Sequence, residues 1–365
     1  MGNIGILSHS HEYFIGMPLI NKPQPSFMEL LTHKRIFDLL LAAQNPVLVS
    51  DVRVDGDSIG SVMAMYHFLL QHGKTARVYV AEAVPEQYRF LPDAYVCSAD
   101  PTLFDDPTID LVAVFDCSEA SFVRGLVDRI QGNPTVINVD HHKTNPRYGH
   151  VNQVLVDSPA TTEVLFRFFE ANHCVITKHV STCLLAGLCF DTNMFSNSAT
   201  NERALSTASH LILHGARVQD VIQTMFQNRS VSALKVWGAA LERLTDHEKI
   251  RVMTTVLTRK DIETHHVTDD EIDGLSNFLN LVADTNTLFV LRETKEGGIK
   301  VSMRSRTKDV SQIAAAHGGG GHAKAAGFTL SEACLIEQDS VWCIQRNNET
   351  HPIAHSLRFE EFFPT

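Results

Sequence analysis

Short apolar runs alternate with longer amphipathic stretches in the first half of the chain. Phe27–Asn45 and Ser58–His72 place apolar residues at helical spacing, as expected for helices that cover one face of a core. The apolar runs have the length of buried strands, and they are Val47–Ser50, Ala76–Val80, Leu111–Phe115 and Thr135–Val139. This alternation predicts an α/β fold with a mostly parallel sheet and helices on both of its faces.

The pattern changes twice further along the chain. Residues 159–245 are mainly helical in pattern, and Gly215 is a predicted helix stop. Strands are then predicted at Ile250–Thr258, Thr287–Leu291 and Ile299–Arg304, with helices near 270–282 and 309–316, which indicates a smaller C-terminal α/β domain. We therefore expect an N-terminal extension, a first domain, a helical linker, a second domain and a C-terminal tail, at residues 1–26, 27–200, 201–245, 246–331 and 332–365.

Composition narrows the class of protein. The 365 residues carry a formal net charge of −11, which disfavours binding to long nucleic acid. The seven cysteines include no CxxC pair, which favours a reducing, cytoplasmic compartment. No apolar run is long enough to span a bilayer, and no signal peptide is apparent, so we expect no membrane partner.

Acidic and imidazole side chains follow the apolar runs. Asp55 and Asp57 come after the first run, Asp116 follows Leu111–Phe115, and the triplet Asp140-His141-His142 ends another. A fourth apolar run, Leu184–Phe190, ends at Asp191. We interpret the four runs as buried strands, whose carboxyl ends lie at the edge of the sheet where ligands bind. Like charges gathered there would destabilise the fold unless divalent cations neutralised them. The pattern therefore predicts a metal centre.

The second half of the chain contains a glycine run followed by a histidine, Gly318–Gly321 and His322. We expect these glycines to form a loop rather than the interior of a helix or strand, with backbone N–H groups turned toward an anion. The preceding strand alternates, so that Ser302, Arg304 and Arg306 share one face. Arginine binds phosphate through two parallel hydrogen bonds, so this region is a candidate phosphate site; the alternative is a glycine run that serves only as a turn.

These motifs in this order resemble the DHH/DHHA1 phosphoesterase superfamily over about residues 28–330. The likeness is greatest to nanoRNase/pAp-phosphatase proteins and dinucleotide phosphodiesterases. It implies a DHH catalytic domain that binds two divalent ions, Mn²⁺ or alternatively Mg²⁺, and a DHHA1 domain that binds substrate. It also implies that Asp116 bridges the two ions. The resemblance gives Asp57, His141 and Asp191 as the other ligands of one ion, and Asp55 and Asp51 as the other ligands of the second.

Asp51 departs from the family pattern, which usually has histidine at this position. Aspartate can still bind Mn²⁺ or Mg²⁺, but it makes the site more negative. The resemblance further assigns catalytic roles to Asp116 and His142, the latter facing the scissile phosphate; a histidine that only orients its neighbours is the alternative. The implied substrate-binding residues are Ser302, Arg304, Gly319, Gly320, Gly321 and His322.

The expected function is metal-dependent hydrolysis of short linear oligonucleotides to mononucleotides, especially of 5′-phosphorylated dinucleotides such as pGpG and pApA. Four alternatives stay open: a pAp 3′-phosphatase, a cyclic-dinucleotide phosphodiesterase, a pyrophosphatase, and an inactive nucleotide sensor suggested only by Asp51. The expected partner is a short nucleotide, not long nucleic acid. The sequence leaves open a homodimer, the base preference and the role of residues 1–26.

Overall fold

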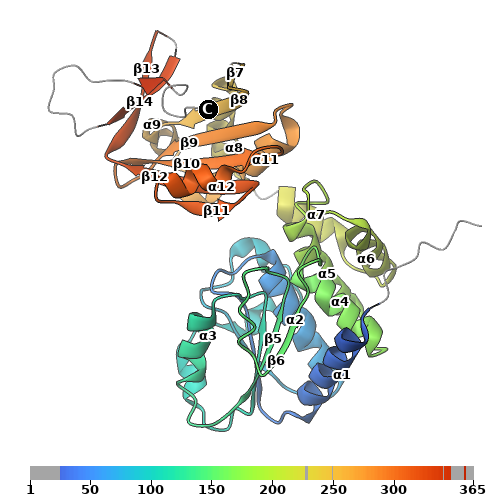
Figure 1. Cartoon of the computed structure of the whole chain (residues 1–365). Coiled ribbons are helices and arrows are strands. Elements are labelled where there is room, and N and C mark those ends of the chain that lie inside the picture. Colours follow the sequence, from blue (N-terminus) through green and yellow to red (C-terminus); the bar gives the residue numbers. More distant parts are fainter. Residues whose placement is uncertain (1–24, 227–228, 249, 340, 347–356, 359–365) are drawn as a thin grey trace, which may run out of the picture. The chain divides into compact units, whose positions relative to one another are not determined.

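The computed structural model describes residues 25–226, 229–248, 250–339, 341–346 and 357–358. The chain divides into two compact units, Met1–Met225 and Phe226–Thr365 (Figure 1). Residues 1–24 of the expected N-terminal extension lie outside the described residues. No helix in the described ranges has both the length and the apolar character needed to cross a membrane.

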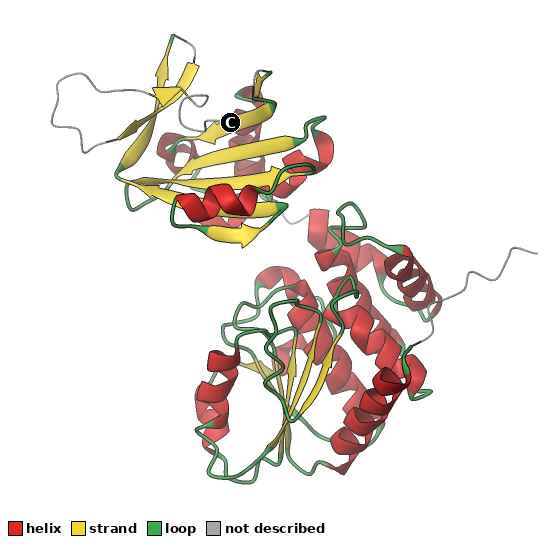
Figure 2. Cartoon of the chain, in the orientation of Figure 1, coloured by secondary structure: helices red, strands yellow, loops and turns green. Residues whose placement is uncertain are grey.

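The first unit contains a six-stranded sheet in which every neighbouring pair of strands is parallel (Figure 2). Its strand order is β3-β2-β1-β4-β5-β6. In chain order the strands are β1 (Pro46–Val49), β2 (Arg77–Tyr79), β3 (Cys97–Ser98), β4 (Leu111–Phe115), β5 (Thr135–Asp140) and β6 (Val151–Val154). The mostly parallel sheet predicted from the sequence is confirmed.

Helices cover both faces of this sheet, and alternate side chains of one strand enter different cores. In β1, Leu48 packs in the cluster that includes residues of α1, α2, α4 and α5, whereas Val47 and Val49 pack in the cluster that includes residues of α3. The helices of this unit are α1 (Phe27–Ala42), α2 (Gly56–Gln71), α3 (Ala120–Val127), α4 (Thr161–Ala171), α5 (Lys178–Asp191), α6 (Glu202–Leu213) and α7 (Val218–Phe226). Three short 3₁₀ helices lie at Glu86–Tyr88, Ala94–Val96 and Pro101–Asp105.

One apolar run is not a strand. Leu184–Phe190 lies within α5, so the interpretation of Asp191 as a residue at a strand end is wrong. Residues 180–189 of α5 are all buried, and a helix buried on every side shows no amphipathic period. Asp191 is the last residue of this helix.

The second unit is built on a six-stranded mixed sheet in the order β11-β12-β10-β9-β8-β7. Its strands are β7 (Thr245–His247), β8 (Val252–Leu257), β9 (Thr287–Glu293), β10 (Gly298–Ser305), β11 (Gly320–His322) and β12 (Ala325–Ser331). The helices are α8 (Val231–Glu242), α9 (Arg259–Thr264), α10 (Asp269–Ile272), α11 (Leu275–Val282) and α12 (Val310–Ala316). A three-stranded antiparallel sheet follows, with β13 (Ala333–Gln338), β14 (Val341–Arg346) and β15 (Leu357–Arg358).

The glycine run differs from the sequence-based expectation. Gly320 and Gly321 belong to β11, a short edge strand that pairs antiparallel with β12, and are not part of a loop. Pairing with a strand that is itself held in the sheet supplies the backbone hydrogen bonds that offset the low strand preference of glycine. Gly320 and Gly321 therefore lie in an edge strand of the second sheet, whereas Gly318 and Gly319 precede it outside regular structure.

Candidate metal centre and substrate-binding face

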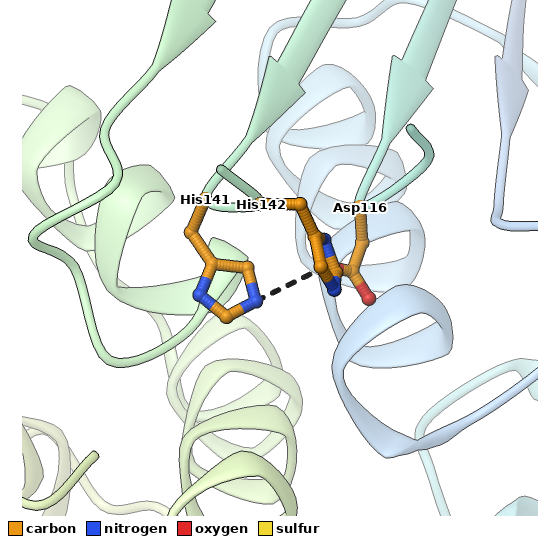
Figure 3. Close-up of side chains that lie close together, drawn as sticks. All are labelled: Asp116, His141 and His142. Carbon is orange, nitrogen blue, oxygen red and sulfur yellow. Dashed lines mark ion pairs between the residues drawn. The ribbon is translucent and has the colours of Figure 1, made fainter. Parts of the chain in front are cut away.

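Four predicted metal ligands meet in the first unit. Asp116 follows β4, His141 follows β5, Asp57 lies in the first turn of α2, and Asp191 ends α5. Two groups of side chains have ligand atoms within 4.8 Å of one another: Asp57, His141 and Asp191, and Asp116, His141 and His142. Figure 3 shows the rings of His141 and His142 beside Asp116. His141 belongs to both groups and thus joins them.

The distances within this cluster suit a shared cation. His141 Nε2 lies 3.0 Å from Asp191 Oδ2 and 3.7 Å from Asp116 Oδ1, and His142 Nδ1 lies 3.6 Å from Asp116 Oδ1. The His141 Nδ1 atom is within 3.2 Å of the Ser158 carbonyl oxygen, which fixes the ring with Nε2 toward the acids. Nε2 is buried and lies beside the carboxylates of Asp191 and Asp116. A divalent cation would satisfy this nitrogen.

The N-terminus of α4 holds two of the carboxylates. Asp57 accepts hydrogen bonds from the backbone N–H groups of Thr161 (2.6 Å) and Thr162 (3.0 Å) and from Thr162 Oγ1 (2.7 Å). Thr161 Oγ1 donates to Asp116 Oδ1 at 2.8 Å. A Cβ atom at Gly187 of α5 would lie 2.6 Å from Asp57 Oδ1 and 2.5 Å from Thr162 Cγ2, so only glycine allows this close approach. The carboxylates are thus fixed by residues far away in the sequence.

Asp140 orients the two histidines. Its Oδ1 accepts from the backbone N–H groups of His141 (2.7 Å) and His142 (3.1 Å) and lies 2.8 Å from His142 Nδ1. Asn145 donates to the other oxygen of Asp140. The hydrogen bond to Asp140 raises the pKa of His142, because it stabilises the protonated ring more than burial disfavours it.

The electrostatics of the cluster favour bound cations. Burial and the charge of Asp191 raise the pKa of Asp57 to about 7 and that of Asp55 to about 6. Burial and the neighbouring acids also raise the pKa of Asp116 well above its usual range. Burial alone would lower the pKa of His141, but the hydrogen bond and charge of Asp191 outweigh it and raise that pKa to about 9. Divalent cations would relieve the repulsion among these acids.

Asp55 and Asp51 are placed differently from the other predicted ligands. Asp55 caps α2, accepting from the backbone N–H groups of Asp57 (3.1 Å) and Ser58 (2.9 Å). The charge of Asp51 raises the pKa of Asp55, and Asp51 forms a side-chain hydrogen bond with the thiol of Cys117. Neither belongs to a group of three metal-spaced side chains within the described ranges.

Register in the second unit places predicted substrate-binding residues on one face. One row across β10, β12 and β11 consists of Arg304, Ala325 and His322. The next row on the same face consists of Ser302, Gly327 and Gly320. Directly paired residues point to the same side of a sheet, and β10 and β11 are separated by two strand spacings, ~9–10 Å. These rows form a face on which two small residues of β12, Ala325 and Gly327, lie between Arg304 and Ser302 on one side and His322 and Gly320 on the other.

The glycines of the run differ in what the fold requires of them. Gly318 (φ 75°) and Gly321 (φ 137°) have backbone angles that disfavour other residues, and a Cβ at Gly319 would lie 2.2 Å from the Gly327 carbonyl oxygen. Gly319 and Gly321 are therefore placed by packing against β12. Gly320 has no positive φ angle, and a Cβ atom there would meet nothing within 4 Å.

Arg304 is held in position on this face. Its Nε donates to Asn277 Oδ1 at 2.8 Å, and Nη1 donates to the Met303 carbonyl oxygen at 2.9 Å. Burial lowers the pKa of its guanidinium. The side chain of Arg304 is therefore ordered before any ligand arrives.

Sequence reasoning missed the residues that support the ligands. Thr161, Thr162, Asn145 and Ser158 were assigned no role, and Asp140 was noted only as part of a motif. A threonine pair at the start of an apolar helix is a local signal for a helix N-terminus, but the carboxylate it holds lies 104 residues away from Thr161. The sequence pattern did not indicate that contact.

Comparisons with known proteins agree with these motifs. The DHH family N-terminal domain model matches residues 46–188, and the DHHA1 domain model matches residues 247–341. The bifunctional oligoribonuclease and PAP phosphatase NrnA of Thermus thermophilus is 32% identical over 312 residues, which cover 85% of this chain and 91% of the relative. The protein of the same name from Mycoplasma genitalium is 23% identical, over 82% of this chain and 93% of the relative.

A solved structure has the same fold. The exopolyphosphatase-related protein from Bacteroides fragilis superimposes with a TM-score of 0.73 at 23% identity, covering 82% of this chain and 90% of that protein. The two domain models, the extended similarity to a relative and the arrangement of the motif residues agree. The chain therefore belongs to the DHH family, with an N-terminal DHH domain and a DHHA1 domain, and is a hydrolase of phosphoester bonds.

Proposed function

We propose that this protein hydrolyses short linear oligonucleotides, especially 5′-phosphorylated dinucleotides, to mononucleotides. The observation that carries the proposal is the cluster of Asp57, Asp116, His141 and Asp191, whose spacing and raised carboxyl pKa values suit divalent cations. The relatives from Thermus thermophilus and Mycoplasma genitalium, named as oligoribonucleases, support the same class of substrate.

We assign the ligands and the catalytic histidine as follows. Asp57, His141 and Asp191 would hold one ion, Asp116 would bridge, and Asp55 with Asp51 would complete a second site. Mixed carboxylate and imidazole donors suit Mn²⁺, with Mg²⁺ as the alternative. Such ions, when bound, activate water and neutralise charge on the phosphate. His142, whose pKa Asp140 raises, donates a proton to the leaving oxygen.

The face of the second unit supplies substrate recognition. Arg304 and His322 bind phosphate, while Ser302 and the backbone of Gly319, Gly320 and Gly321 contact the rest of the nucleotide. The small residues of β12 between them leave room for a flat group. A net charge of −11 provides no field for a long polyanion, which supports short substrates.

A 3′-phosphatase activity on pAp is the second candidate. It is supported by the relatives' names, which join the two activities in one protein. In both reactions water attacks a phosphorus and the 3′ oxygen of the sugar leaves; they differ in whether the attacked phosphate is a diester that links two nucleotides or a terminal monoester.

A substrate panel tests the proposal directly. The purified full chain is incubated with Mn²⁺ and, separately, with pGpG, pApA, pAp, cyclic dinucleotides and pyrophosphate, and products are separated by chromatography. We expect rapid mononucleotide release from the linear dinucleotides and slower release of phosphate from pAp. Turnover of pyrophosphate alone, or tight binding of nucleotides without turnover, would overturn the proposal.

Gly320→Ala tests the face of the second unit. The new methyl group meets no atom of the protein, so the fold should be unchanged, but it would press on a bound substrate. We expect KM for pGpG to rise about tenfold with little change in thermal stability. Gly238→Ala is the matched control, because Gly238 of α8 is exposed and also has free space for a Cβ atom, and it should leave KM unchanged. An unchanged KM in Gly320→Ala would remove the glycine run from the substrate site.

A further inference from the structure

An exposed aromatic side chain lies next to one of the candidate metal ligands. Phe190 precedes Asp191 at the end of α5 and is 37% exposed, although residues 180–189 of the same helix are all buried. Isolated exposed apolar residues are common on protein surfaces, so exposure alone indicates no function. The evidence for a function comes from the contacts that hold this ring beside the ligands.

Phe190 packs against the segment that carries two other candidate ligands. Gly56 lies between Asp55 and Asp57. A Cβ atom on Gly56 would lie 2.6 Å from Phe190 Cβ and 2.7 Å from Phe190 Cγ, so no side chain separates the ring from this turn of α2. Helices α2 and α5 are neighbours, as Figure 1 also shows. The ring of Tyr88, which is 5% exposed, packs edge-to-face on Phe190 with ring centroids 6.0 Å apart. Aromatic pairs in this arrangement attract one another, so the ring of Phe190 is held in place.

The end of α5 is fixed by an unusual turn. Residues 193–195, none of them glycine, have successive φ angles of 46°, 54° and 62°. Such left-handed conformations cost free energy in residues other than glycine, persist only where the surroundings enforce them, and are frequent at functional sites. The first N–H group of this turn donates to the Phe190 carbonyl oxygen at 3.0 Å, and Asn197 Nδ2 donates to the Asp191 carbonyl oxygen at 2.7 Å. One turn therefore holds both the exposed ring and the neighbouring ligand.

Phenylalanine at this position suits one kind of partner. The ring has no hydrogen-bond donor for phosphate oxygens, so it contributes nothing to the binding of an inorganic phosphate. A flat heteroaromatic ring joined to the phosphate can stack on it, and nucleobases stack on aromatic side chains whichever base they are. We propose that Phe190 stacks with a nucleobase of the substrate when the adjoining phosphate lies at the metal centre. This inference rests on the proposed function and deepens it, because the contact selects nucleotides over inorganic phosphates.

Stacking on Phe190 predicts how affinity depends on the ligand. Contact between a base and an aromatic side chain raises affinity about tenfold or more. Nucleotides of guanine and adenine should gain similarly, because the ring forms no hydrogen bonds with the edges of the bases. Ribose 5-phosphate has the sugar and the phosphate of GMP without the base, so it should gain nothing from the ring. GMP and ribose 5-phosphate are therefore a matched pair of probes.

Calorimetry on the full-length protein with Mn²⁺ measures the affinity of both probes. We expect GMP to bind at least tenfold more tightly than ribose 5-phosphate. Phe190→Leu keeps an apolar contact with Gly56 but removes the aromatic face, so GMP affinity should fall about tenfold while ribose 5-phosphate affinity stays within a factor of about two. Phe190→Trp should restore GMP affinity. Unchanged GMP affinity in Phe190→Leu, or equal losses for the two probes, would overturn the proposal.

Turnover of pGpG separates failure of this inference from failure of the proposed function. In Phe190→Leu we expect KM for pGpG to rise about tenfold while kcat stays within about threefold, because stacking acts on substrate binding. Phe27→Leu makes the same change at a phenylalanine of α1 that is 75% exposed, and it should leave KM unchanged. An active wild type with unchanged KM in Phe190→Leu refutes the stacking alone. A wild type that hydrolyses no linear dinucleotide refutes the proposed function, and the affinities for GMP and ribose 5-phosphate then still test the stacking.

Discussion

Replacing Thr162 by valine isolates one hydrogen bond behind the metal centre. Valine keeps the shape of the side chain but removes the hydroxyl that lies 2.7 Å from Asp57 Oδ1, while the backbone N–H bond of 3.0 Å remains. A hydrogen bond to a buried charged group contributes ~1.5–3 kcal/mol. If Asp57 binds the ion as a carboxylate, most of this free energy stabilises the metal-bound state, so Mn²⁺ affinity should fall about 10- to 100-fold.

Calorimetric Mn²⁺ titration at pH 7.5 measures this loss. Thr162→Ser is the matched control, because it keeps the hydroxyl and loses only a buried methyl group; it should lose some stability but retain Mn²⁺ affinity within a factor of about three. Wild-type affinity in Thr162→Val would refute the reasoning. Equal losses in the serine and valine variants would mean that packing, and not the hydrogen bond, supports Asp57.

Three further predictions follow from charge and burial. Asp51→His restores the residue usual in the family and breaks the hydrogen bond to Cys117; activity measured with Mn²⁺ and Mg²⁺ should shift in favour of Mn²⁺, and an unchanged rate with an unchanged metal profile would contradict this. Burial lowers the pKa of His33 from 6.5 to about 4, so the unfolded chain binds a proton that the folded protein excludes, and stability falls as pH drops from 6.5 to 4. This group alone accounts for a loss of about 3 kcal/mol, which urea unfolding should show as the difference in pH dependence between wild type and His33→Phe. In the metal-free protein the pKa values of Asp57 (about 7) and Asp55 (about 6) are raised, so stability falls as pH rises from about 4 to 7. Mn²⁺ should therefore raise Tm more at pH 7.5 than at pH 5, and an equal gain at both would argue against ionisation of these acids on metal binding.

The parallel sheet could be predicted because its strands are buried on both faces. Each residue of β1 and β4 is buried, and such strands appear in the sequence as continuous apolar runs. The same reasoning, that a continuous apolar run is a buried strand, gave a wrong prediction at Leu184–Phe190. A helix buried on all sides gives an equally continuous apolar run. Length was the better guide there, since α5 has 14 residues.

Ligand candidates could be found from the sequence, but the residues that hold them could not. Asp57, Asp116 and the two histidines stand beside strands or at a helix start, where local pattern places them. The contact of Asp57 with Thr161 joins residues 104 positions apart, and it depends on how α4 packs against α2. Edge strand β11 was missed for a related reason, because its stability comes from β12 and not from its own glycines.

The hydrogen bonds from α4 to Asp57 and Asp116 bear on how a metal ion would enter this site. N–H and hydroxyl groups of the chain already fasten these oxygens, so the coordinating atoms remain aimed at one point without help from the ion. Loading then requires no refolding, and one cation can replace another while the surrounding architecture stays intact. For a site built in this way, the local supply of divalent ions would weigh as much as ligand chemistry in deciding which element it holds.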